Sequence, residues 1–212
     1  MKLVYGSGSE TTGACWMSAI HWYTRNGNSW TDQPDCVSPL IRRLCISLND
    51  WLKSDADREK YIGPHIFAPV GTKTTKEDEI KRGFLCADRA VRTFAPWWLR
   101  RTEKAELIAM AARLEALEPI VDKKTADAAA VVAQAAKKAA YAASAADAAD
   151  AASAASAASA ASAADAASAY DHVARQRVQL ILDCCAIGQK VDVCPTKTKE
   201  QTVEFLCSFD KK

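Results

Sequence analysis

Gly13-Ala-Cys15-Trp16 is the stretch whose residue types come nearest to enzyme chemistry. A cysteine that opens a helix can act as a nucleophile, because the positive end of the helix dipole favours its thiolate form. A hydrolase built on such a thiolate also needs a histidine within hydrogen-bond reach and an acid to orient that histidine. His65, which lies in a predicted loop, is the candidate base, and Asp88 or Asp50 is the candidate acid.

This segment resembles the nucleophile segment of papain-like proteases and transglutaminases, where Cys opens a helix and Trp follows it. The resemblance implies a hydrolase with Cys15 and His65 as its catalytic residues. It covers four or five residues only. Those families also carry the histidine on strands of a sheet, and strands of that kind are not predicted here. We therefore favour a semi-buried Cys beside a core Trp and keep the hydrolase as an alternative.

A second cluster, Trp97-Trp98-Leu99-Arg100-Arg101, combines large aromatic rings with guanidinium groups. Such residues can stack on bases or hold phosphates. Trp97, Trp98, Arg100 and Arg101 are therefore the candidate binding residues. Nearby carboxylates cancel much of this positive charge, so Trp residues buried between helices with solvated Arg residues are the interpretation we favour.

Neither a metal nor a cofactor is predicted. The chain has three His and eight Cys but no CxxC pair, and it contains no phosphate loop, GxGxxG or HExxH motif. The first residues, MKLVYGSGSE, contain no secretory apolar segment, and no bulky apolar run is long enough to span a bilayer. We therefore expect a cytoplasmic protein with reduced thiols and no membrane partner. The net charge of +2 gives no general reason to expect nucleic acid as a partner.

The elements that must position these residues are predicted to be helices, which makes the chain all-α. Ser38 followed by Pro39 predicts the start of an amphipathic helix. A further helix is expected to end at Pro96. All six Trp lie within the first 98 residues, so the core should be N-terminal. The predicted organisation is a helical body over 1–119, an Ala-rich long helix or helical hairpin over 120–188, and a tail over 189–212 that packs on the body.

The Ala-rich segment has a period of three, since every third residue from Ser144 to Asp171 is Ser or Asp. On an α-helix this polar stripe moves by about 60° per repeat, so no face stays apolar for long. A single helix over 126–187 would be about 93 Å long at about 1.5 Å per residue. Small side chains allow close packing at almost any rotation. The segment is therefore either an arm for self-association or a solvated low-complexity helix, and the pattern favours neither.

Four segments, CWMSAIHWYT, CVSPLIRRLCISLND, GFLCADRAVRTFAPWWLR and LEALEPIVD, precede the Ala-rich tract. In these the chain resembles uncharacterised Ala-rich helical proteins of actinobacteria and their phages. The resemblance implies an all-helical body and an accessory protein related to phages, and it carries no catalytic residues across.

Three functions are compatible with these observations. The first is a non-enzymatic interaction or assembly module that binds a protein partner or itself and forms a homo-oligomer through the Ala-rich helix. The second is a helical protein that binds or sequesters a small ligand or nucleotide between its helices, for example against host defence. The third is the Cys15-dependent hydrolase. The sequence ranks them in this order.

Overall fold

The computed structural model describes residues 2–6, 8–9, 11–24, 30–150, 161–193 and 195–209, and their side chains except for 142–150 and 161–167. The predicted all-α class is confirmed. The strands in the described residues form one small antiparallel pair, β1 (Gly8–Ser9) and β2 (Gly13–Ala14). No helix within these residues is both long and apolar enough to cross a membrane.

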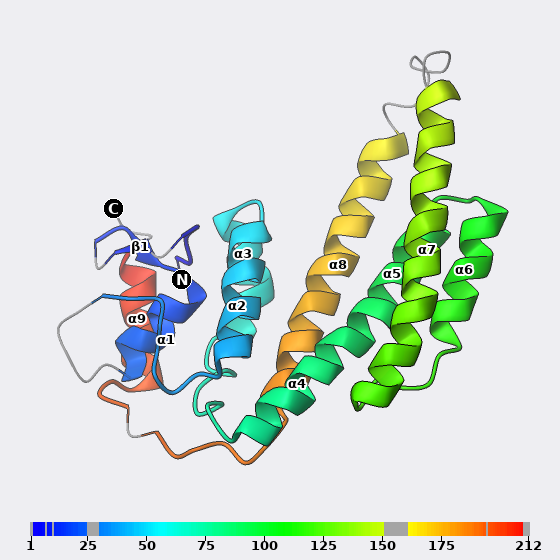
Figure 1. Cartoon of the computed structure of the whole chain (residues 1–212). Coiled ribbons are helices and arrows are strands. Elements are labelled where there is room, and N and C mark those ends of the chain that lie inside the picture. Colours follow the sequence, from blue (N-terminus) through cyan, green and yellow to red (C-terminus); the bar gives the residue numbers. More distant parts are fainter. Residues whose placement is uncertain are drawn as a thin grey trace. The chain divides into compact units, whose positions relative to one another are not determined.

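Helices form the rest of the fold, as Figure 1 shows. In chain order they are α1 (Trp16–Thr24), α2 (Pro39–Trp51), α3 (Asp55–Ile62), the short 3₁₀ turn η1 (Gly63–His65), α4 (Lys76–Arg89), the π-helical turn η2 (Ala90–Phe94), α5 (Ala95–Arg100), α6 (Ala105–Glu115), α7 (Lys123–Asp150), α8 (Ala161–Cys185) and α9 (Lys199–Ser208).

Several helices begin at a side-chain cap. The predicted start of α2 is confirmed: Ser38 Oγ accepts from the Ile41 amide at 3.2 Å, and Pro39 occupies the first turn. Thr198 forms a capping box with Gln201 at the start of α9. These caps satisfy amides that have no partner within the helix, so each start is specified locally by the sequence.

The chain divides into two compact units. Unit 1 consists of Met1–Glu79 and Tyr170–Lys212, and unit 2 of Ile80–Ala169. The boundaries between these units follow Glu79 and Ala169, whereas the predicted boundaries follow residues 119 and 188. Two helices, α4 and α8, each contribute residues to both units.

Unit 1 contains the aromatic and aliphatic core around α1. Trp16 is fully buried, and its indole Nε1 donates to the Ile66 carbonyl at 2.9 Å. Other fully buried residues come from α2 and from the last helices, namely Ile41, Leu48, Ile181 and Leu206. Removing these side chains from water supplies most of the stabilisation of such a core.

The C-terminal tail contacts α1 within unit 1. The rings of Trp22 and Phe205 stack with centroids 4.3 Å apart, so α9 lies against α1. Before α9, the Val191 amide donates to the Gly71 carbonyl at 2.8 Å. Gly71 has a φ of +74°, and a Cβ there would lie 2.5 Å from Val191 O. A glycine is therefore required where the tail crosses this loop.

In unit 2 the chain stays helical through α4, η2 and α5. The prediction that Pro96 ends this helix is wrong, because Trp97, Trp98 and Leu99 lie in α5 itself. Pro96 has no N–H and its ring clashes with the carbonyl four residues before it in a regular α-helix. The widened π turn precedes the proline, and the Ala95 amide donates to Ala90 O, five residues back.

The Ala-rich region gives two described helices, α7 and α8, with residues 151–160 outside the described part. Most of the period-three segment from Ser144 to Asp171 therefore lies where no side chain is described. In unit 2, α6 packs against both α5 and α7. Leu107, Ala111 and Leu114 of α6 are buried in this packing.

Candidate functional site

An apolar pocket in unit 2 has the features of a ligand-binding site. It has a volume of about 310 Å³. All of its lining residues belong to unit 2, and they come from η2, α5, α6 and α7: Ala90, Val91, Ala95, Trp98, Leu99, Leu114, Ala133, Ala136, Lys137 and Ala140. Ligand pockets in proteins are typically concave, mostly apolar and at least about 300 Å³ in volume.

The α7 side of this pocket consists of Ala133, Ala136, Lys137 and Ala140. Their spacing is i, i+3, i+4 and i+7, which puts all four on one face of the helix. In most helix bundles such a face carries bulky residues that fill the space to the next helix. Here three of the four are Ala, and the space opposite α5 and α6 stays open.

Trp98 and Leu99 form the α5 side. Trp98 has an exposed fraction of 54%, so its ring borders both the pocket and solvent. Trp97 meets the Trp98 ring edge to face, with centroids 4.8 Å apart. The neighbouring ring therefore restricts the orientation of the one that lines the pocket.

The structure separates the four predicted binding residues. Trp98 lines the pocket, whereas the Arg101 guanidinium lies over the Trp97 ring at 5.1 Å from its centroid. Arg100 Nε donates to Glu115 Oε1 at 3.1 Å, and this hydrogen bond and charge lower the pKa of the Glu115 carboxyl. Both arginines therefore contact other residues of unit 2, namely Glu115 and Trp97. Of the four predicted residues, Trp98 lines the pocket.

Sequence reasoning missed the lining residues on α7 and α6. The sequence carries a partial signal: alanines recur around Lys137 on one face of α7, and α6 before it has large apolar residues at the same spacing. A small-residue stripe opposite a large-residue stripe predicts either close packing or an open pocket, and only the three-dimensional structure distinguishes the two.

Cys15, the other predicted site residue, lies just before α1 and is buried. Its Sγ accepts from the Ser18 amide at 3.4 Å and lies 3.2 Å from Ser18 Oγ. Burial is the largest influence on this thiol and raises its pKa, against the smaller lowering by the bonds from Ser18. The sulfur therefore caps α1 as a neutral thiol.

None of the residues proposed to assist Cys15 forms a hydrogen bond with its sulfur among the described residues. His65 lies in η1, and no hydrogen bond joins its side chain to Cys15 among the described residues. Asp50 accepts from the Gly6 amide and from Asn49 Nδ2, both at 3.2 Å. Asp88 belongs to unit 2, where it accepts from the Ile120 amide and pairs with Arg92.

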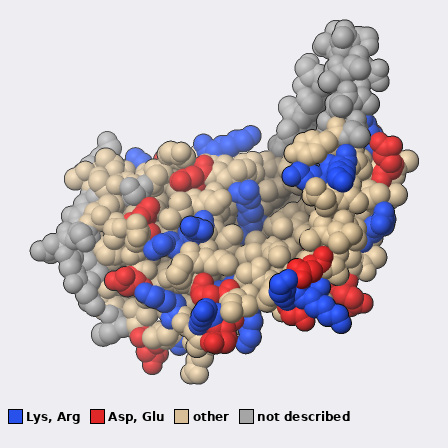
Figure 2. Space-filling model, in the orientation of Figure 1, with Lys and Arg blue, Asp and Glu red and all other residues tan. Residues whose placement is uncertain are grey.

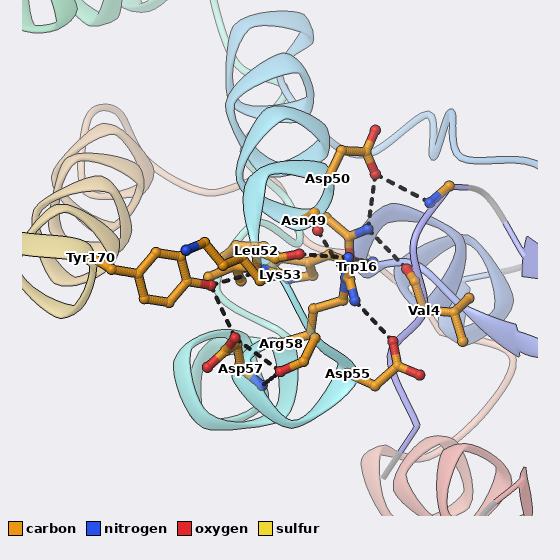
Figure 3. Close-up of polar contacts among 12 residues, drawn as sticks. Val4, Trp16, Asn49, Asp50, Leu52, Lys53, Asp55, Asp57, Arg58 and Tyr170 are labelled. Atoms are coloured by element: carbon orange, nitrogen blue, oxygen red, sulfur yellow. Dashed lines mark hydrogen bonds and ion pairs between the residues drawn. The ribbon is translucent and has the colours of Figure 1, made fainter. Parts of the chain in front are cut away.

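A partly buried polar network in unit 1 is another concentration of functional groups (Figure 3). The Arg58 side chain is 4% exposed and donates to the Asn49 and Leu52 carbonyls at 2.8 and 2.7 Å, and it pairs with Asp55. The Tyr170 hydroxyl donates to Asp57 at 3.0 Å and accepts from the Lys53 amide at 2.9 Å. These groups satisfy one another and the end of α2, so the network has a structural role.

Neither the charge on the face shown in Figure 2 nor the described metal-ligating residues point to a second site. On the face shown in Figure 2, basic and acidic side chains are interspersed, with no large area of one sign. No group of three or more His, Cys, Asp or Glu is arranged to hold a metal ion in the part of the chain that the structure describes.

Comparisons with known proteins give no family for this chain. It matches no protein family model, no curated protein and no solved structure.

Proposed function

We propose that this protein binds a small, largely apolar molecule in the pocket of unit 2. The observation that carries the proposal is the open space of about 310 Å³ between packed helices, bordered by apolar side chains. An engineered apolar cavity of about 150 Å³ is enough to bind benzene. The pocket is therefore large enough for roughly two rings or a short acyl chain. The resemblance to phage-related accessory proteins suggests a use for such binding, which is to sequester the molecule from the host.

The chemistry of the lining favours an apolar molecule over a nucleotide. A nucleotide brings several phosphate charges and sugar hydroxyls, each of which needs a polar partner when it leaves water. Of the described residues that line the pocket, Lys137 is the one with a charged side chain, and Trp98 adds a single indole N–H. This set of groups satisfies one polar group on a ligand, and the rest of the ligand must be apolar.

A binding test uses the neutral fluorescent probe N-phenyl-1-naphthylamine. We expect saturable binding with one site per chain in the unmodified protein. Ala133→Leu adds a bulky side chain to the pocket wall and should weaken binding at least about tenfold, since the added atoms occupy the space that the probe needs.

The matched control is Ala130→Leu, because Ala130 lies on the same helix, is exposed and does not line the pocket. It should bind the probe as the unmodified protein does. Circular dichroism melting of both variants checks that each is folded. Equal probe affinity in Ala133→Leu and Ala130→Leu would rule out this pocket as the binding site.

A further inference from the structure

We propose that the molecule bound in the unit 2 pocket is an amphipathic monocarboxylate, with its acid group at Lys137. The inference rests on the proposed function and adds the chemical class of the ligand. Its starting point is the asymmetry of the pocket: nine of the ten lining residues are apolar and one is a lysine. A ligand that matches this lining has an apolar body with one anionic end.

The Lys137 ammonium is available for such a group. The Lys137 side chain is exposed and its Nζ lies over the Tyr141 ring, 5.7 Å from the centroid. Among the described residues it forms no ion pair. An exposed cation–π contact contributes only about 0.5–1 kcal/mol, so a carboxylate can draw the ammonium away from the ring at little cost.

Other cations near the pocket already have partners. Arg100 is paired with Glu115, and Arg92 Nη1 bonds Asp88 Oδ1 at 3.0 Å. Unit 2 as a whole is close to balanced, with twelve Lys and Arg against ten Asp and Glu. An anion is therefore favoured at the pocket by Lys137 itself, the lining residue with a charged side chain.

One ammonium also distinguishes a carboxylate from a phosphate. A lysine acts as a single point charge, and it balances the single charge of a carboxylate. A phosphate monoester carries close to two negative charges at neutral pH, and protein sites for it commonly use the paired N–H groups of arginine or several backbone amides. The pocket lining contains no arginine.

The test compares octanoate with 1-octanol, which share an eight-carbon chain and differ in charge. Isothermal titration calorimetry of the full chain at low salt should show about fivefold tighter binding of octanoate, the size of effect expected for a solvent-exposed ion pair. Lys137→Gln should remove this preference, so that octanoate binds no more tightly than 1-octanol to the same variant. Raising the salt concentration should reduce the preference in the unmodified protein.

Lys138→Gln is the matched control, because Lys138 is adjacent, exposed and absent from the lining. It should keep the preference for octanoate. Equal binding of the two ligands by the unmodified protein, or equal loss of preference in both variants, overturns this inference. The proposal that the pocket binds an apolar molecule would still stand in that case. If neither ligand nor N-phenyl-1-naphthylamine binds, the proposed function fails and this inference fails with it.

Discussion

Asn49 and Arg58 show how single buried polar residues hold unit 1 together. Asn49 Nδ2 donates to the Val4 carbonyl at 2.9 Å, and Asn49 Oδ1 accepts from the Trp16 amide at 3.2 Å (Figure 3). Arg58 donates to two carbonyls at the end of α2. Both side chains supply hydrogen-bond partners to backbone groups that irregular segments and helix ends leave unpaired. Leaving such a buried group unpaired costs about 1–3 kcal/mol of stability.

Cys15 gives a prediction at the same scale. Its pKa is raised mainly by burial, so the reactive thiolate should be scarce at neutral pH. Iodoacetamide at pH 7.5, followed by peptide mass spectrometry, should modify Cys15 more slowly than Cys207, which is only partly buried. The rate at Cys15 should rise when the pH is raised above 9, as the thiol ionises. Faster modification of Cys15 than of Cys207 at pH 7.5 would restore the hydrolase as a candidate.

Residue types alone predicted only part of the candidate site. The aromatic character of Trp98 made it a candidate binding residue, and the structure places it in the lining of the proposed pocket. Lys137 was overlooked, because a lysine within an Ala-rich helix has the sequence pattern of a solvated residue. Its proposed role depends on which face of α7 meets α6, and the packing of these two helices decides that face.

At the scale of elements, the cap residues Ser38 and Pro39 correctly predicted the start of α2. Pro96, read as the end of a helix, gave a wrong prediction. Proline usually interrupts a helix, since it removes one hydrogen bond and crowds the preceding turn. In this chain the five-residue turn η2 absorbs that crowding, and α5 continues to Arg100. A π turn has no sequence signal comparable to a cap, so this outcome was not predictable from the residues around it.

Substituting Gly71 and Gly83 by alanine should change the stability of the protein in opposite directions. Gly71→Ala should destabilise unit 1 by about 1–3 kcal/mol, because its φ of +74° is strained for alanine and the Cβ would meet Val191 O. Gly83 lies within α4, and nothing lies within 4 Å of a Cβ added there. Gly83→Ala should therefore stabilise the protein by about 0.5–1 kcal/mol.

Urea denaturation of the two variants measures both effects. Limited proteolysis supplies a second readout, since the strain at Gly71 should expose the 189–198 segment to cleavage. A Gly71→Ala variant as stable as the unmodified protein would mean that the tail does not cross the loop as described.

At the scale of the whole molecule, the Ala-rich segment remains a predicted site of self-association. Deleting Ala142–Ser159 removes 18 residues, a length that corresponds to five whole turns in the predicted single helix. If the segment drives assembly, light scattering should show a smaller oligomer after the deletion. An unchanged oligomer would remove this role, and unchanged probe binding in the same sample would show that the pocket is independent of it.

The sharing of α4 and α8 between the two units determines how the protein can be dissected. Isolating unit 2 as a fragment would mean cutting α4 after Glu79 and α8 after Ala169, inside helices. The α4 fragment would lose its start, where Thr75 Oγ1 accepts from the Asp78 amide at 3.2 Å. Each cut would expose a row of backbone groups without partners. A fragment with intact helix ends must therefore extend from about Thr75 to Cys185, and so carries part of unit 1 with it.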